Sequence, residues 1–127
     1  MKVGVIGSRA IKGSDKEAKK TVFQTLEKNI PENCTEIVSG GAIGVDTFAA
    51  EFAKKKRLSL KVFLPEYDKF GKEAPLLRNI KIVEYSQYVL AFWDGKSRGT
   101  AYTVSTCVEK GIPVKVIRID CPNEEEK

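Results

Sequence analysis

Glycine, hydroxyl and charged residues occur together at three places in the sequence. The three stretches are Gly7-Ser8-Arg9, Ser39-Gly40-Gly41-Ala42-Ile43-Gly44-Val45-Asp46 and Asp94-Gly95-Lys96-Ser97-Arg98-Gly99-Thr100. Glycine lets main-chain N–H groups come close to a ligand, and arginine offers a rigid fork of donors that suits phosphate or carboxylate. The spacing is neither the dinucleotide fingerprint GxGxxG nor the GK[ST] of a P-loop. The pattern therefore indicates an anion site and leaves the ligand open.

Each of these residues also has a plainer interpretation. Arg9 could be a surface residue that pairs with a nearby acid, and the glycines could serve tight packing of a strand on a helix. Asp46 falls in the first turn of a predicted helix, where it could offset the helix dipole or accept hydrogen bonds from a ribose or base. Tyr67 could stack on a base or lie at the rim, whereas Trp93 fits the core better than a ligand contact.

Catalytic chemistry has few candidates in this chain. The sequence contains no histidine, which removes histidine acid–base chemistry and any histidine-ligated metal site. The carboxylates near the glycine-rich stretches are Asp46, Asp94 and Glu84, and we regard Asp46 and Asp94 as weak catalytic candidates. No metal and no required cofactor are expected, although a bound nucleotide or phosphate is possible.

The elements that must position these residues follow from the apolar pattern. Strands are predicted at Lys2–Gly7, Thr35–Ser39, Ser59–Leu64, Gln87–Trp93 and Pro113–Ile119. Between them, helical spacing of apolar residues predicts one helix capped by Ser14 or Asp15 and ended by Pro31, one after the second glycine stretch, one with Pro75 in its first turn, and one at Gly99–Lys110. We predict a loop at Glu66–Lys72.

Strict alternation of strands and helices predicts the fold class. Right-handed crossovers between parallel strands give an α/β protein, a three-layer α/β/α sandwich around a five-stranded, mainly parallel sheet in the order 3-2-1-4-5. Such sheets bind ligands beyond the carboxyl ends of the strands, where the order reverses. Residues 1–120 are expected to form a single domain, followed by an acidic, frayed tail at 121–127.

Composition narrows the setting in which the protein works. No apolar run approaches the roughly 20 residues that span a bilayer, and three cysteines without CxxC spacing argue against a disulfide framework. We therefore predict a cytoplasmic protein without a membrane partner. The net charge of +5 is compatible with solvated helix faces or with attraction to a polyanion, and Lys54–Arg57 also suit the end of a helix.

Four motifs resemble the SLOG superfamily: GSR at 7–9, SGGAIGVD at 39–46, LLRN at 76–79 and AFWDGKSRGT at 91–100. The sequence is most similar to the YspA/YpsA-like branch, with the DprA/Smf and LOG families as relatives. The resemblance implies a Rossmann-like fold that binds a nucleotide or nucleotide-derived ligand, often as a homo-oligomer (dimer or tetramer). The pocket residues it supports are Gly7, Ser8, Arg9, Ser39, Gly40, Gly41, Ala42, Gly44, Asp46, Arg78, Asn79, Asp94, Gly95, Ser97, Arg98, Gly99 and Thr100.

Two departures from the relatives bear on function. Thr103 stands where the LOG phosphoribohydrolases carry a catalytic Glu, and the chain has no room for the extra segments of DprA. We therefore expect a module that senses or sequesters a nucleotide-derived small molecule. A nucleoside-phosphate hydrolase or transferase is the alternative, and DprA-like binding of nucleic acid ranks below both.

Overall fold

A five-stranded parallel sheet forms the centre of the protein, of which the computed structural model describes residues 1–7, 16–41 and 44–119. The strands are β1 (Lys2–Gly7), β2 (Glu36–Ser39), β3 (Ser59–Val62), β4 (Tyr88–Trp93) and β5 (Val114–Arg118). Each pairs in parallel with its neighbours in the order β3-β2-β1-β4-β5. The predicted order and direction of the strands are confirmed. β3 ends at Val62, before its predicted end at Leu64.

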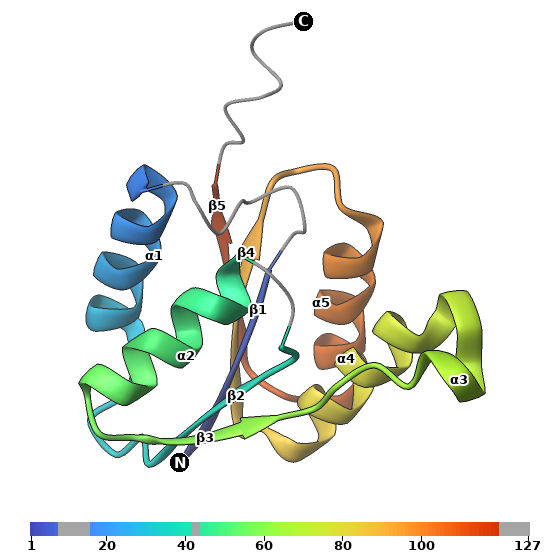
Figure 1. The fold of residues 1–127 in the computed structure, drawn as a ribbon, viewed down its shortest axis with the longest axis horizontal. Coiled ribbons are helices and arrows are strands. Elements are labelled where there is room, and N and C mark those ends of the chain that lie inside the picture. Colours follow the sequence, from blue (N-terminus) through green and yellow to red (C-terminus); the bar gives the residue numbers. More distant parts are fainter. Residues whose placement is uncertain (8–15, 42–43, 120–127) are drawn as a thin grey trace, which may run out of the picture.

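Helices cover both faces of this sheet and complete a three-layer, Rossmann-like sandwich (Figure 1). The longer helices are α1 (Lys16–Asn29), α2 (Val45–Lys55), α4 (Ala74–Tyr85) and α5 (Arg98–Lys110). α1 and α2 lie on one face, and α4 and α5 lie on the other. No helix in the described part of the chain is long and apolar enough to cross a membrane.

Two apolar clusters, one on each face of the sheet, hold the layers together. Val22, Leu26 and Phe48 belong to the cluster beneath α1 and α2, and Ile82 and Cys107 to the cluster beneath α4 and α5. The apolar stripe predicted for α1 is confirmed, since Ala18, Val22 and Leu26 are buried. Its predicted caps, Ser14 and Asp15, lie outside the described residues, as does the predicted tail at 121–127.

The central strands are buried on both sides, as the apolar run before Trp93 predicts. Val89, Leu90, Ala91 and Phe92 of β4 are inaccessible to solvent. A strand without a solvated face has no polar alternation, and this pattern is typical of a parallel sheet covered by helices. β1 and β4 are thereby fixed side by side, and the loops that follow them face the same edge.

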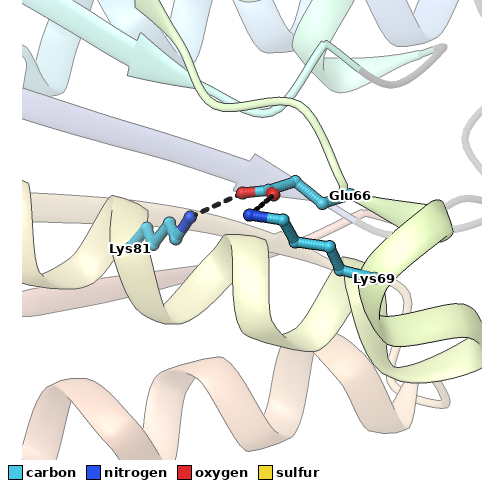
Figure 2. Close-up of polar contacts among 3 residues, drawn as sticks. All are labelled: Glu66, Lys69 and Lys81. Carbon is cyan, nitrogen blue, oxygen red and sulfur yellow. Dashed lines mark hydrogen bonds and ion pairs between the residues drawn. The ribbon is translucent and has the colours of Figure 1, made fainter.

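The predicted loop at Glu66–Lys72 is wrong. The segment forms a short helix, α3 (Tyr67–Phe70), and a 3-10 turn, η1 (Gly71–Glu73). The main-chain carbonyl of Glu66 accepts hydrogen bonds from the N–H groups of Lys69 and Phe70. The Glu66 carboxylate pairs with Lys69 at 3.3 Å and with Lys81 of α4 at 2.9 Å (Figure 2). These contacts fix a segment that has no apolar periodicity from which a helix could be predicted.

Several basic residues on or next to α1 and α2 lie in ordinary surface positions. Lys19 pairs with Glu51 at 3.0 Å, and Lys56 pairs with Glu27. Lys54 and Lys55 lie in the last turn of α2, where cations stabilise the negative end of the helix dipole. Solvated helix faces and the helix dipole are therefore sufficient to account for the basic residues on the α1–α2 surface.

Candidate ligand-binding site

A cavity of about 610 Å³ opens where the order of the strands reverses between β1 and β4. Ile6 and Gly7 at the end of β1 form its floor, and the loop after β4 and the first turn of α5 form one side. The predicted residues that line the cavity are Gly7, Asp46, Arg78, Asn79, Asp94, Ser97, Arg98, Gly99 and Thr100. Open parallel sheets bind their ligands at this position.

Other predicted residues lie outside the cavity lining. The residues that do not line it are Ser39 at the end of β2 and, in the loops nearby, Gly40, Gly41, Gly44 and Gly95. Ser8, Arg9 and Ala42 lie outside the described residues. Glu84 does not line the cavity and pairs with Lys110 at 3.1 Å, so the structure does not support it as an acid or base for this site. Tyr67 is 55% exposed and does not line the cavity either.

The loop after β4 is shaped by the buried carboxylate of Asp94. One oxygen, Oδ1, accepts hydrogen bonds from the N–H groups of Lys96 at 2.9 Å and Ser97 at 2.8 Å. Ser97 caps α5, because its hydroxyl accepts a hydrogen bond from the N–H of Thr100 at 3.3 Å. The indole N–H of Trp93 donates to the Ser97 carbonyl at 2.9 Å. Asp94 therefore holds the backbone that presents the first turn of α5 to the cavity.

The two helix N-termini at this edge differ in charge. The first turn of α5 contains no acidic residue and brings Arg98 into the cavity lining. The first turn of α2 contains Asp46, which is 8% exposed and also lines the cavity. A carboxylate there offsets the positive end of the helix dipole from within the protein. An anion would therefore be stabilised at α5 more than at α2.

Two of the glycines make room for protein side chains. A Cβ atom on Gly7 would lie 2.6 Å from Cβ of Val45, so this glycine lets the end of β1 pack against the start of α2. A Cβ atom on Gly40 would overlap the guanidinium of Arg78. Packing thus explains both glycines, although Gly7 also lines the cavity. Gly44, with φ of 93°, holds a left-handed conformation that favours glycine.

Arg78 and Asn79 point into the protein from α4. Arg78 is 8% exposed, and its Nη1 donates a hydrogen bond to the Gly40 carbonyl. Its Nε donates to Oδ1 of Asn79 at 2.8 Å. The structure brings both side chains to the cavity, since both line it.

The site also contains residues that sequence reasoning missed, including Lys72 of η1, Leu76 of α4 and Tyr102 of α5. Helical spacing could have indicated Tyr102, because it lies one turn after Arg98 on the same side of α5. No pattern in the sequence indicates Lys72, which reaches the cavity only because the segment around Glu66 is folded against α4. One further buried group, the Ser39 hydroxyl at the end of β2, has no hydrogen-bond partner among the described residues.

The chemistry available in the cavity is that of charge and hydrogen bonding. Lys72, Arg78 and Arg98 contribute positive charge, and Asp46 and Asp94 contribute negative charge. Neither described cysteine offers a nucleophile: burial raises the pKa of the Cys107 thiol to about 11, and it also raises the pKa of the Cys34 thiol. Thr103, at the position of the LOG Glu, is 1% exposed and donates its hydroxyl to the Gly99 carbonyl at 2.8 Å.

Solved structures with this architecture include a cofactor-binding protein and two DNA-processing proteins. The molybdenum cofactor binding protein from Rippkaea orientalis matches with a TM-score of 0.70 and 21% identity, over 98% of this chain and 80% of that chain. DNA processing protein A from Streptococcus pneumoniae matches with a TM-score of 0.70 and 25% identity, over 96% of this chain. This chain covers 52% of the pneumococcal protein, about half its length.

A second DNA processing protein A, from Helicobacter pylori, matches with a TM-score of 0.68 and 24% identity, over 98% of this chain and 70% of that chain. A search of curated proteins finds no match to the sequence. The family model for DNA recombination-mediator protein A matches residues 1–67, more than half of the chain. The protein therefore belongs to the DNA recombination-mediator protein A family, within the SLOG-type Rossmann-like proteins.

Proposed function

We propose that the cavity binds a nucleotide-derived small molecule, with a phosphate group at the first turn of α5. The observation that carries this proposal is the cavity-lining turn Ser97–Thr100, which has no acidic residue, contains Arg98 and shares the cavity with Lys72. Main-chain N–H groups, the helix dipole and a guanidinium all favour a phosphate there. Asp46 makes the N-terminus of α2 the poorer of the two helix N-termini for a phosphate.

The remaining walls suit the rest of such a ligand. Asp46 can accept hydrogen bonds from a ribose hydroxyl or an N–H group of a base. Pro75, Leu76 and Tyr102 supply apolar surface against which a planar ring can pack. Ligand pockets commonly combine an apolar lining with a few polar groups that fix orientation. Binding without turnover is the simplest function of this arrangement, since the buried Asp94 carboxylate already holds the loop.

The proposal is tested by titrating the protein with AMP, ATP, ADP-ribose, NAD and cyclic dinucleotides, followed by calorimetry and thermal shift. Arg98→Ala should weaken binding of the best ligand about ten-fold or more, the scale of a lost charge-assisted hydrogen bond. Arg57→Ala removes the same charge from an exposed position after α2, outside the cavity lining, and should leave the affinity unchanged. Equal affinities for the Arg98→Ala variant and the wild type would refute the phosphate position.

Single-stranded DNA is the second candidate ligand, and family membership favours it. One of the structural relatives, from Helicobacter pylori, is described by its single-stranded DNA binding mode. Fluorescence anisotropy with a labelled oligonucleotide across a salt series would detect such binding, because contacts to several phosphates give a steep salt dependence. A nucleotide that competes with the oligonucleotide would place both ligands in the same cavity.

We also propose that the protein forms a homo-oligomer through the side of the molecule that carries α5 and β5. Three apolar residues are exposed there: Tyr102 at 51%, Val108 at 70% and Val116 at 44%. Exposed apolar residues on neighbouring elements favour contact with another subunit. The mass of the assembly in solution, measured by light scattering, tests this proposal.

A further inference from the structure

A continuous series of hydrogen bonds joins α5 to the glycine loop after β2. The Thr103 hydroxyl donates to the Gly99 carbonyl at 2.8 Å and accepts a hydrogen bond from Nδ2 of Asn79 at 3.0 Å. Oδ1 of Asn79 accepts from Nε of Arg78 at 2.8 Å, and Nη1 of Arg78 donates to the Gly40 carbonyl. The series therefore passes from α5 through α4 to the loop after β2.

The direction of every bond in this series is set by the chemistry of its members. A guanidinium can only donate hydrogen bonds, so Asn79 must present its amide oxygen to Arg78. The Asn79 amide nitrogen then faces Thr103 and donates to the hydroxyl. The hydroxyl proton in turn goes to the Gly99 carbonyl. The Arg78 guanidinium thus sets which way the Asn79 amide faces, and the Thr103 hydroxyl holds the other end of that amide in place.

Burial makes this arrangement sensitive to the loss of a single group. Thr103 is 1% exposed and Arg78 is 8% exposed, so water has little access to either end of the Asn79 side chain's contacts, although Asn79 itself is half-buried. Gly40 leaves no alternative space, since a Cβ atom at that position would overlap the Arg78 guanidinium. The loop after β2 and the first turn of α5 are therefore placed relative to each other through these side chains.

We infer that Thr103 is a positioning residue of the ligand site. It does not line the cavity, yet its hydroxyl fixes Asn79 and, through Asn79, the cavity-lining side chain of Arg78. The consequence for ligand binding rests on the function proposed above, whereas the consequence for Arg78 does not. Thr103 stands where the LOG enzymes carry a catalytic Glu, and in this protein it would hold other residues of the site in place.

The chain offers a closely matched control one turn further along α5. Thr106 is 7% exposed, and its hydroxyl donates to the Tyr102 carbonyl at 3.0 Å, the same bond to the preceding turn that Thr103 makes. Only Thr103 also accepts a hydrogen bond from a side chain of α4. Thr103→Val and Thr106→Val therefore remove the same group from the same helix, and Thr103→Ser keeps the hydroxyl.

The test records the Arg78 Nε–H signal by NMR in the full chain and the affinity for AMP by calorimetry. In Thr103→Val the signal should move and its hydrogen exchange should accelerate about ten-fold or more, as expected when a hydrogen bond is lost. The affinity for AMP should fall in the same variant. Thr106→Val and Thr103→Ser should match the wild type in both measurements.

An unchanged Arg78 Nε–H signal in Thr103→Val would overturn the inference, whether or not AMP binds. If AMP does not bind the wild type, the proposed AMP binding fails and the Arg78 signal alone decides the role of Thr103. If Thr103→Val does not fold, hydrogen exchange in the wild type decides instead. The Asn79 Nδ2–H that donates to Thr103 should then exchange about ten-fold or more slowly than the side-chain amide of the exposed Gln24, and equal rates would overturn the inference.

Discussion

At the scale of single residues, glycine has two different uses around this site. Gly44 holds a positive φ that begins α2, whereas Gly40 makes room for the guanidinium of Arg78. The sequence shows only that glycines gather before a helix. Glycine is favoured in a tight turn, beside a ligand and next to a buried side chain. Only the structure shows which of these three reasons applies to a given glycine.

Gly40→Ala should lower the free energy of unfolding by about 1–3 kcal/mol, because the new methyl group displaces the buried Arg78 side chain. Gly99→Ala is the control. A Cβ atom there would meet nothing closer than Leu76 at 3.8 Å, and alanine favours a helix more than glycine does. Urea unfolding measures both variants. Equal stability of Gly40→Ala and the wild type would contradict the packing described for Arg78.

Asp94→Ala should destabilise the protein by about 1–3 kcal/mol, since two main-chain N–H groups lose their carboxylate acceptor. Asp94→Asn keeps an acceptor oxygen and should lose less. Chemical unfolding of the two variants measures the difference. If the two substitutions cost the same, the carboxylate of Asp94 does not act through these hydrogen bonds.

At the scale of elements, the segment α3–η1 marks the limit of prediction from sequence. The longer helices follow from apolar spacing, and the strands from apolar runs, because burial against the sheet produces both patterns. The segment at Tyr67–Glu73 buries none of its residues. Its position depends on the contacts of Glu66 with Lys69 and Lys81, which are distant from the core and leave no periodic signal.

The contribution of Glu66 should depend on pH. Hydrogen bonds from Lys81 and Lys69 lower the pKa of this carboxyl group below its ordinary value of 4.5. Its stabilising effect is therefore complete above the ordinary pKa and is lost as the pH falls through the lowered value. The free energies of unfolding of the wild type and Glu66→Gln, measured in urea, should differ at pH 7 and become equal in acid. A constant difference across this range would exclude the ion pairs as its cause.

At the scale of the whole molecule, the alternation of strands and helices was enough to predict the sheet order and the edge at which the loops meet. The positions of Asp94, Ser97 and Arg98 follow from that order. Lys72 and Thr103 could not be predicted, because their roles arise from contacts between elements distant in the sequence. Topology thus locates the site, and side-chain packing between α4 and α5 completes it.

The exposed apolar side of α5 and β5 gives a prediction for the assembly. Val108→Glu should convert an oligomer into a smaller species, since it places a charge on a residue that is 70% exposed in the single chain. Lys20→Glu, on the exposed surface of α1, serves as the control. Light scattering after gel filtration measures both masses. A wild-type monomer, or a Val108→Glu assembly of unchanged mass, would contradict an interface at this position.

The central claim is that the cavity at the strand-order reversal binds the phosphate of a nucleotide-derived ligand at the first turn of α5. An NMR titration with AMP tests it most directly, because each main-chain amide reports on its own surroundings. We predict the largest changes in amide chemical shift at Ser97–Thr100, smaller changes near Asp46 and no change at Glu32 or Arg57. Saturating AMP that leaves the amides of Ser97–Thr100 unmoved would contradict it.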